Sequence, residues 1–167
     1  TLALEKHLGP AYMRFGRTAV PNFTDADTEF EIEKAQLLNE GKDVSVFATG
    51  HLVWKAIQAC ETLEAKGISC EVINIHTIKP LDEKTILSSV KKTKCVVTAE
   101  EHQRNGGLGD SIAQLLAREF PVPIEMVAVN DTFGESGKPD ELLRKYKIDT
   151  PNIIEAAEIV LKRKFVY

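Results

Sequence analysis

The chain has 167 residues, of which 43% are hydrophobic and 28% are charged, and its formal net charge is -4. These values are typical of one globular domain with a sizeable core and room for a fragment of another. The mild negative charge argues against a nucleic-acid-binding protein, and no apolar run approaches the roughly 20 residues that a membrane span needs.

The first twenty residues look like the end of a domain. Residues 1–8 carry a helical pattern that ends at the breaker Gly9-Pro10, and residues 11–15 are strand-like. A helix and a strand with nothing before them suggest the last units of something longer. The chain begins with Thr1, as a processed protein or an excised fragment would.

The sequence divides into three parts on this interpretation. Residues 1–21 are the C-terminal remnant of a preceding domain, residues 22–28 are a polar linker, and residues 29–167 are the main domain. In that domain, residues 35–38 and 44–48 are expected to be strands joined as a hairpin by a turn containing Gly41.

Strands and helices then alternate. Apolar periodicity, turn residues and caps predict helices at 51–65, 83–91, 109–120, 140–146 and 151–162, and strands at 68–75, 95–99 and 124–129. Such alternation implies right-handed βαβ crossovers. We therefore predict an α/β fold: a three-layer, Rossmann-like domain whose mostly parallel sheet has one antiparallel edge strand and helices on both faces.

Cysteine usage indicates the compartment. Cys60, Cys70 and Cys95 are odd in number and lack CxxC spacing. We interpret them as buried thiols of a reducing compartment and not as disulfides or a zinc site. No basic-then-apolar leader is recognisable, so a cytoplasmic protein is expected.

Two glycine-containing turns could hold a phosphate. The run Gly106-Gly107-Leu108-Gly109 opens a predicted helix, yet it lacks the spacing of a dinucleotide site or a P-loop. Ser136-Gly137-Lys138 lacks the upstream glycine of a P-loop. The favoured interpretation is a tight strand-to-helix turn for the first and a turn leading into the next helix for the second. No G-x-S-x-G elbow supports a Ser–His–Asp site.

Acidic and histidine side chains follow several predicted strands. Glu100, Glu101 and His102 come at a strand end, where sites of α/β proteins lie. Because neighbouring strand residues point to opposite sides, the three cannot converge, and a structural or interface role is favoured over acid–base or metal chemistry. His51 and His76 each stand alone and are interpreted as structural or surface residues.

Two arginines lie within or just after the first strand-like segment. Arg17 comes just after it, with Gly16 allowing a bend, and Arg14 lies within it. A guanidinium there can bind a phosphate or carboxylate through two parallel hydrogen bonds. The alternative is a solvated arginine on a linker, which position alone narrowly favours.

Five motifs in order resemble the transketolase family and cover nearly the whole chain. They are Tyr12-Met13-Arg14-Phe15-Gly16-Arg17 with Pro21, Val46-Phe47-Ala48-Thr49-Gly50, Ile75-His76-Thr77-Ile78-Lys79-Pro80-Leu81-Asp82, Thr98-Ala99-Glu100-Glu101-His102 with the glycine-rich turn, and Phe133-Gly134-Glu135-Ser136-Gly137-Lys138-Pro139 through Leu143. The chain is similar to the end of the pyrimidine-binding domain followed by the C-terminal domain. It also resembles the C-terminal subunit of a split enzyme.

The resemblance implies a transferase of the pentose phosphate pathway. Transketolases move a two-carbon ketol unit between sugar phosphates with thiamine diphosphate and a divalent metal such as Mg²⁺, in a site built across a dimer. Arg17 matches the family's arginine for the substrate phosphate. The C-terminal domain supplies no cofactor contact that can be carried over, and its implied role is contact within a homodimer. The remaining domains or an N-terminal subunit are the implied partners.

Family features that this sequence lacks matter equally. The Gly-Asp-Gly…Asn motif for metal and diphosphate does not occur, nor does the pyrimidine-domain glutamate. The chain alone is therefore expected to bind no cofactor and to be inactive. Two alternatives stay open: the end of a 1-deoxyxylulose-5-phosphate synthase or of a 2-oxo acid dehydrogenase β subunit, and a non-catalytic assembly module. The stretch 136–143 favours transketolase over the synthase and dehydrogenase.

Overall fold

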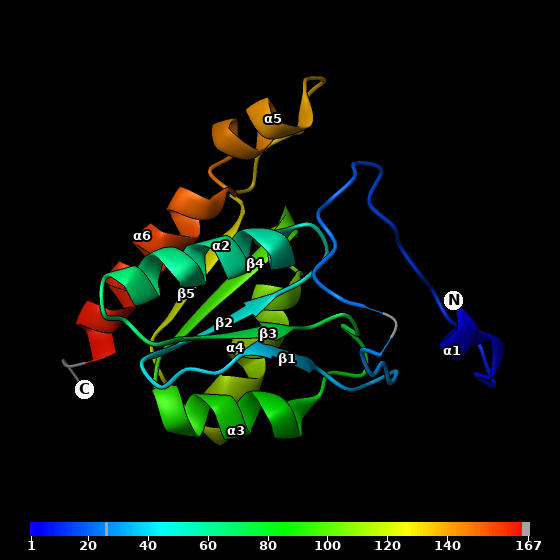
Figure 1. Ribbon diagram of the computed structural model, residues 1–167, viewed down its shortest axis with the longest axis horizontal. Coiled ribbons are helices and arrows are strands. Elements are labelled where there is room, and N and C mark those ends of the chain that lie inside the picture. Colours follow the sequence, from blue (N-terminus) through cyan, green and yellow to red (C-terminus); the bar gives the residue numbers. More distant parts are fainter. Residues whose placement is uncertain (26, 165–167) are drawn as a thin grey trace.

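The computed structural model describes residues 1–25 and 27–164, and it holds a five-stranded sheet between two layers of helices (Figure 1). The strands are β1 (Gln36–Asn39), β2 (Val44–Ala48), β3 (Cys70–Asn74), β4 (Val96–Gln103) and β5 (Ile124–Val129). The helices are α1 (Leu2–Glu5), α2 (Leu52–Ala65), α3 (Glu83–Thr93), α4 (Leu108–Glu119), α5 (Pro139–Lys145) and α6 (Thr150–Lys164). The predicted α/β class is confirmed.

Two hydrophobic clusters hold the helices against the sheet. Leu52 and Ile153 belong to the cluster that joins α2 and α6 to one face. Ile86 and Ile112 belong to the cluster that joins α3 and α4 to the other face, and Figure 1 shows the two helix pairs on opposite sides. All four side chains are completely buried. Strands covered on both faces can be apolar along their whole length, as β2 nearly is.

The expected hairpin between β1 and β2 is wrong, whereas the antiparallel edge strand is confirmed. The sheet order is β1-β3-β2-β4-β5, and β1 runs antiparallel to β3, with Leu37 opposite Ile73. β2 lies between β3 and β4 and is parallel to both. Because every residue of β2 is buried, this strand belongs in the middle of the sheet and not beside an edge strand.

Gly41 lies on the segment that carries the chain from β1 to β2 past the start of β3. A Cβ atom on Gly41 would lie 2.2 Å from the carbonyl carbon of Cys70 and 2.3 Å from the nitrogen of Glu71. Gly41 is buried, and its φ is not among the positive values. The glycine is therefore needed for a close approach of two backbone segments and not for a left-handed turn.

The N-terminal segment also differs from expectation. Residues 11–15 form no strand, and Tyr12 is 90% exposed and Phe15 72% exposed. A strand needs a neighbour to pair its backbone groups, and among the described residues none lies beside this segment. The expected helix at 1–8 is the shorter α1, which lies away from the sheet in Figure 1. The division at residues 1–21, 22–28 and 29–167 stays a prediction, and residues 26 and 165–167 lie outside the described residues.

Asp82 caps the start of α3 and also binds the segment before β1. Its Oδ1 accepts the backbone N–H of Thr85 at 3.1 Å, and its Oδ2 accepts the Thr85 hydroxyl at 2.7 Å and the N–H of Ala35 at 2.9 Å. Burial alone would raise the pKa of Asp82. These hydrogen bonds, with the nearby Lys34, outweigh burial and hold that pKa below its ordinary value.

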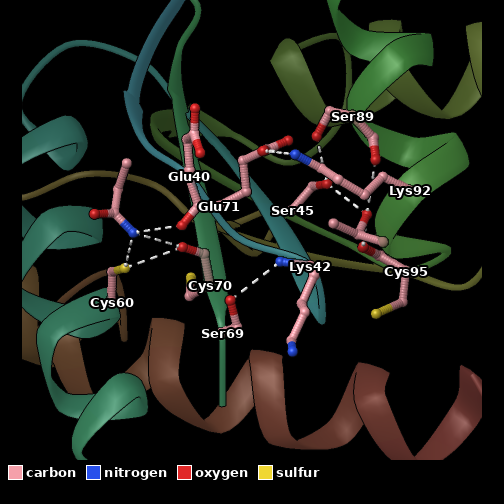
Figure 2. Close-up of polar contacts among 12 residues, drawn as sticks. Glu40, Lys42, Ser45, Cys60, Ser69, Cys70, Glu71, Ser89, Lys92 and Cys95 are labelled. Atoms are coloured by element: carbon pink, nitrogen blue, oxygen red, sulfur yellow. Dashed lines mark hydrogen bonds and ion pairs between the residues drawn. The ribbon is translucent and has the colours of Figure 1, made fainter. Parts of the chain in front are cut away.

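Buried polar contacts fix β2 and β3 against α3, as Figure 2 shows. The Ser45 hydroxyl oxygen lies 2.6 Å from the hydroxyl oxygens of both Ser89 and Thr93. Glu71 on β3 is buried and pairs with Lys92 near the end of α3. Each group would cost roughly 1–3 kcal/mol if buried without a partner, so these contacts make the packing of α3 specific.

All three cysteines are buried and carry free thiols, which confirms the prediction of buried thiols. The Cys60 thiol donates to the carbonyl oxygen of Cys70 at 3.2 Å, and the Cys95 thiol donates to the carbonyl oxygen of Asp43 at 3.2 Å. A hydrogen bond with Cys60, together with burial, raises the pKa of the Cys70 thiol. Burial raises the pKa of Cys95 to about 11. Both of these thiols therefore stay protonated at neutral pH.

Candidate functional site

The histidine and acidic side chains that follow the predicted strands lie at the carboxyl edge of the sheet. β2, β3 and β4 are parallel, so the residues that follow them meet at one edge. His51 comes after β2 and His76 after β3, while Glu101 and His102 lie in the last part of β4. Ligand and catalytic sites of α/β proteins lie at this edge.

His51 and Glu101 form a pair there. The His51 Nδ1 atom lies 3.2 Å from Glu101 Oε2, and the two side chains are 17% and 42% exposed. The sequence interpretation left His51 isolated, because it could not show that β2 and β4 are neighbours. Register brings the two together: Ala48 is paired with Ala99, and each side chain follows shortly after.

The arginine-bearing segment passes over this pair. A Cβ atom on Gly16 would lie 1.8 Å from His51 Nε2 and 2.3 Å from its Cε1, so the Gly16 backbone packs directly on the ring. Arg17 follows Gly16 and is exposed, as is Arg14. Within residues 1–25 and 27–164, neither guanidinium forms an ion pair, so each is available to an anion. The role of Arg17 stays a prediction.

Glu100 points to the opposite side of β4 from Glu101, as strand geometry predicts. Its side chain is buried, and its two oxygens accept the backbone N–H groups of Leu108 at 2.7 Å and Gly109 at 2.8 Å. A Cβ atom on Gly107 would lie 2.2 Å from Glu100 Oε2. The carboxylate thus occupies the N-terminus of α4, where a phosphate would have bound, and the glycine-rich turn is a structural turn.

His76 packs on the segment before β1, whereas His102 contacts Glu100 and Gln103 of its own strand. The ring centroids of His76 and Phe30 are 4.3 Å apart, and His76 Nδ1 lies 3.0 Å from the Thr77 hydroxyl. Burial lowers the pKa of His76, which favours the neutral ring. His102 is exposed, and its Nδ1 lies 3.0 Å from the carbonyl oxygen of Gln103. Neither ring meets a second histidine or an arginine in these contacts.

The Ser136-Gly137-Lys138 turn leads into α5, as expected. Lys138 is the residue before the helix, and Pro139 is its first residue. A Cβ atom on Gly137 would lie 2.9 Å from the Leu142 side chain, so the turn packs on its own helix. The Lys138 ammonium lies 3.9 Å from Glu141 and is well exposed, which makes it a solvated surface charge.

The described part of the chain offers no metal centre. Across residues 1–25 and 27–164, no three His, Cys, Asp or Glu side chains cluster closely enough to hold a metal ion. These residues therefore do not provide the group of carboxylate and other oxygen ligands that Mg²⁺ takes. None of the helices in the same residues has the length and apolar character to span a membrane.

Comparison with known proteins identifies the family. Residues 33–153 match the family described as "Transketolase, C-terminal domain". The chain is 44% identical over 158 residues to the 6-deoxy-6-sulfo-D-fructose transketolase subunit of Clostridium sp. strain MSTE9, covering 95% of this chain and 49% of that protein. It is 36% identical over 155 residues to an apulose-4-phosphate transketolase subunit of Phocaeicola vulgatus, covering 92% of this chain and 49% of that protein.

Two further matches are to a synthase of the same family and to a solved structure. The 1-deoxy-D-xylulose-5-phosphate synthase 1 of Geobacter sulfurreducens is 36% identical over 163 residues, which cover 95% of this chain and 25% of that enzyme. A solved structure described as a split gene transketolase, inactive beta4 tetramer, superposes with a TM-score of 0.86 at 41% identity and covers 89% of this chain and 49% of that chain. The chain spans about half the length of the transketolase subunits it matches. With the family matched over residues 33–153 and a relative sharing its fold, the chain belongs to the transketolase C-terminal domain family.

Proposed function

We propose that this chain is the C-terminal part of a transketolase that transfers a two-carbon ketol unit between sugar phosphates. The family match over residues 33–153 carries the proposal, and two relatives that are named transketolase subunits support it. Thiamine diphosphate and Mg²⁺ bind to the remaining domains or to an N-terminal subunit, because the described residues contain no donor cluster for the metal. When bound, the cofactor stabilises the carbanion of the transferred unit.

In this proposal Arg17 binds the anionic group of the sugar substrate. Arg17 is exposed at the carboxyl edge of the sheet, beside the Gly16 contact with His51. The names of two relatives support an anion, since one substrate carries a sulfo group and the other a phosphate. A guanidinium donates two parallel hydrogen bonds to either group.

The Arg17→Ala variant of the complete enzyme tests this role. One charged hydrogen bond contributes about 1.5–3 kcal/mol, so the KM for a sugar phosphate should rise roughly ten- to a hundredfold. Separate assays with a phosphorylated and a sulfonated ketose would identify the preferred anion. Arg14→Ala is the matched control and should leave KM within about threefold. An unchanged KM in Arg17→Ala would remove Arg17 from the site.

The isolated chain is proposed to bind no thiamine diphosphate and to be inactive. One substrate arginine without a diphosphate-binding domain cannot offset the ordering cost of tight binding. The related structure described as an inactive beta4 tetramer supports this expectation. Calorimetric titration with thiamine diphosphate and Mg²⁺, followed by an assay of transfer from xylulose 5-phosphate, tests it. Micromolar binding or measurable turnover would contradict it.

The domain itself is also proposed to self-associate through a two-fold interface as a homodimer. Two-fold pairs are the commonest assembly of soluble chains, and the related tetramer shows that a chain of this family can self-associate. Sedimentation velocity at several concentrations measures the assembly. A strict monomer at high concentration would mean that other domains hold the dimer together.

A second candidate is the C-terminal piece of a 1-deoxyxylulose-5-phosphate synthase. The observation that favours it is the 36% identity over 163 residues to the Geobacter enzyme. Chromatographic detection of 1-deoxy-D-xylulose 5-phosphate separates the two functions, because a transketolase does not make this product. Its formation by the complete enzyme would replace the transketolase proposal.

A further inference from the structure

The strap, defined as residues 8–24, contacts the main domain beside the predicted substrate arginine. Among the described residues, no hydrogen bond joins the strap to the rest of the chain. Its apolar side chains near the arginine are largely exposed, with Tyr12 at 90% and Phe15 at 72%. The direct contact beside Arg17 is the packing of Gly16 on the ring of His51. Further along, Phe23 packs against the hydrophobic cluster of α2.

The contact at Gly16 is specific for glycine. A Cβ atom there would lie 1.8, 2.3 and 2.7 Å from three ring atoms of His51, all far closer than van der Waals contact. The φ of Gly16 is not positive, so backbone conformation does not require the glycine. The reason for glycine at this position is therefore space for the histidine ring.

The His51 ring is fixed by its position after β2 and by its contact with Glu101 on the neighbouring strand β4. His51 directly precedes α2 with a φ of -62°, and its side chain is 17% exposed. Its Nδ1 faces Glu101 Oε2 at 3.2 Å, which favours the proton on Nδ1 and leaves Nε2 toward Gly16. The ends of β2 and β4 thus present a fixed surface to the backbone at Gly16.

We propose that His51, oriented by Glu101, is a positioning residue that holds the strap so that Arg17 reaches the anionic group of the substrate. The inference rests on the proposed role of Arg17. Any freedom of the backbone that carries Arg17 must be lost when the substrate binds, and that entropy loss weakens binding. Packing Gly16 on a fixed ring removes part of this loss before the substrate arrives. The C-terminal domain therefore sets substrate affinity without touching the reacting atoms.

Steady-state kinetics of the complete enzyme test the inference. His51→Ala should raise the KM for a sugar phosphate about five- to tenfold while kcat stays within about twofold. Gly16→Val should act alike, and it changes the exposed strap without altering the core of the sheet. Both effects should vanish for a ketose donor that lacks the phosphate, because Arg17 has nothing to bind there. His102→Ala, a nearby exposed histidine, is the matched control and should leave KM unchanged.

A double-mutant cycle separates this inference from the proposed function. In the Arg17→Ala background, His51→Ala should add no further rise in KM. If Arg17→Ala raises KM but His51→Ala and Gly16→Val do not, the inference fails and the role of Arg17 stands. If Arg17→Ala leaves KM unchanged, the role of Arg17 fails first. Independent, multiplicative effects of the two substitutions, or a loss of kcat with unchanged KM, would also overturn the positioning role.

Discussion

Replacing Glu100 by Gln should destabilise the domain far more than the same change at the next residue. The Glu100 carboxylate is buried and accepts the N–H groups of Leu108 at 2.7 Å and Gly109 at 2.8 Å. Glutamine offers one acceptor oxygen, so one buried N–H loses its partner at a cost of about 1–3 kcal/mol. Loss of the negative charge at the N-terminus of α4 adds about 0.3–1 kcal/mol, which makes the expected total about 1–4 kcal/mol.

Urea unfolding followed by circular dichroism measures this difference. Each variant is unfolded at two protein concentrations, so that self-association is recognised by a shift between them. Glu101→Gln is the control, because its carboxylate is 42% exposed and pairs with His51 at the surface. A pair of this kind is worth about 0–1 kcal/mol. Equal effects of the two substitutions, or an effect of Glu100→Gln below about 0.5 kcal/mol, would refute the reasoning.

Gly107 provides an independent test of the same contact. A Cβ atom at this position would lie 2.2 Å from Glu100 Oε2, so Gly107→Ala should also destabilise the domain, by about 1–3 kcal/mol. Combined with Glu100→Ala, the substitution no longer meets the carboxylate. The double variant should therefore lose less stability than the sum of the losses in the two single variants. Strict additivity would show that the two residues do not share the contact.

Three more predictions concern the core. Gly41→Ala should lower stability by about 3 kcal/mol, because its Cβ would meet backbone atoms of β3, whereas Gly134→Ala, with open space around it, should be neutral in the same thermal unfolding assay. Burial opposes ionisation of Asp82, but hydrogen bonds hold its native pKa below 3.8. Its contribution to the free energy of unfolding is therefore fully present above pH 3.8 and is lost as the pH falls through the lower native pKa. The destabilisation by Asp82→Asn should accordingly shrink as the pH falls below about 4 in acid unfolding curves, and a constant difference would contradict this. The three buried thiols should react with a thiol reagent at pH 8 only after unfolding, and rapid labelling of Cys95, whose pKa burial raises to about 11, would contradict its burial.

Much of the fold followed from local pattern. Helical periodicity and caps located α2, α3, α4 and α6, since an apolar face and an N-terminal cap such as Asp82 are written in neighbouring residues. The alternation of strands with helices was enough to predict a parallel sheet covered on both faces. Motif order likewise led to the transketolase family, which the comparisons confirm.

The local pattern did not predict which strands are neighbours in the sheet. The turn residues around Gly41 suggested a hairpin, yet the chain passes β3 there and β1 pairs with β3 instead of β2. A short polar segment fits a reversal and a crossing equally well. Only the burial of β2 on both faces decides between them, and that depends on helices distant in sequence.

The pairing of His51 with Glu101 depends on the tertiary structure for the same reason. Each residue alone looked like a surface or structural side chain, because 50 positions separate them in the chain. The identities of these residues, and of Gly16 and Arg17, can be read directly from the sequence. Their meeting at one edge was decided by the strand order, since only adjacent parallel strands bring the residues that follow them within hydrogen-bonding distance.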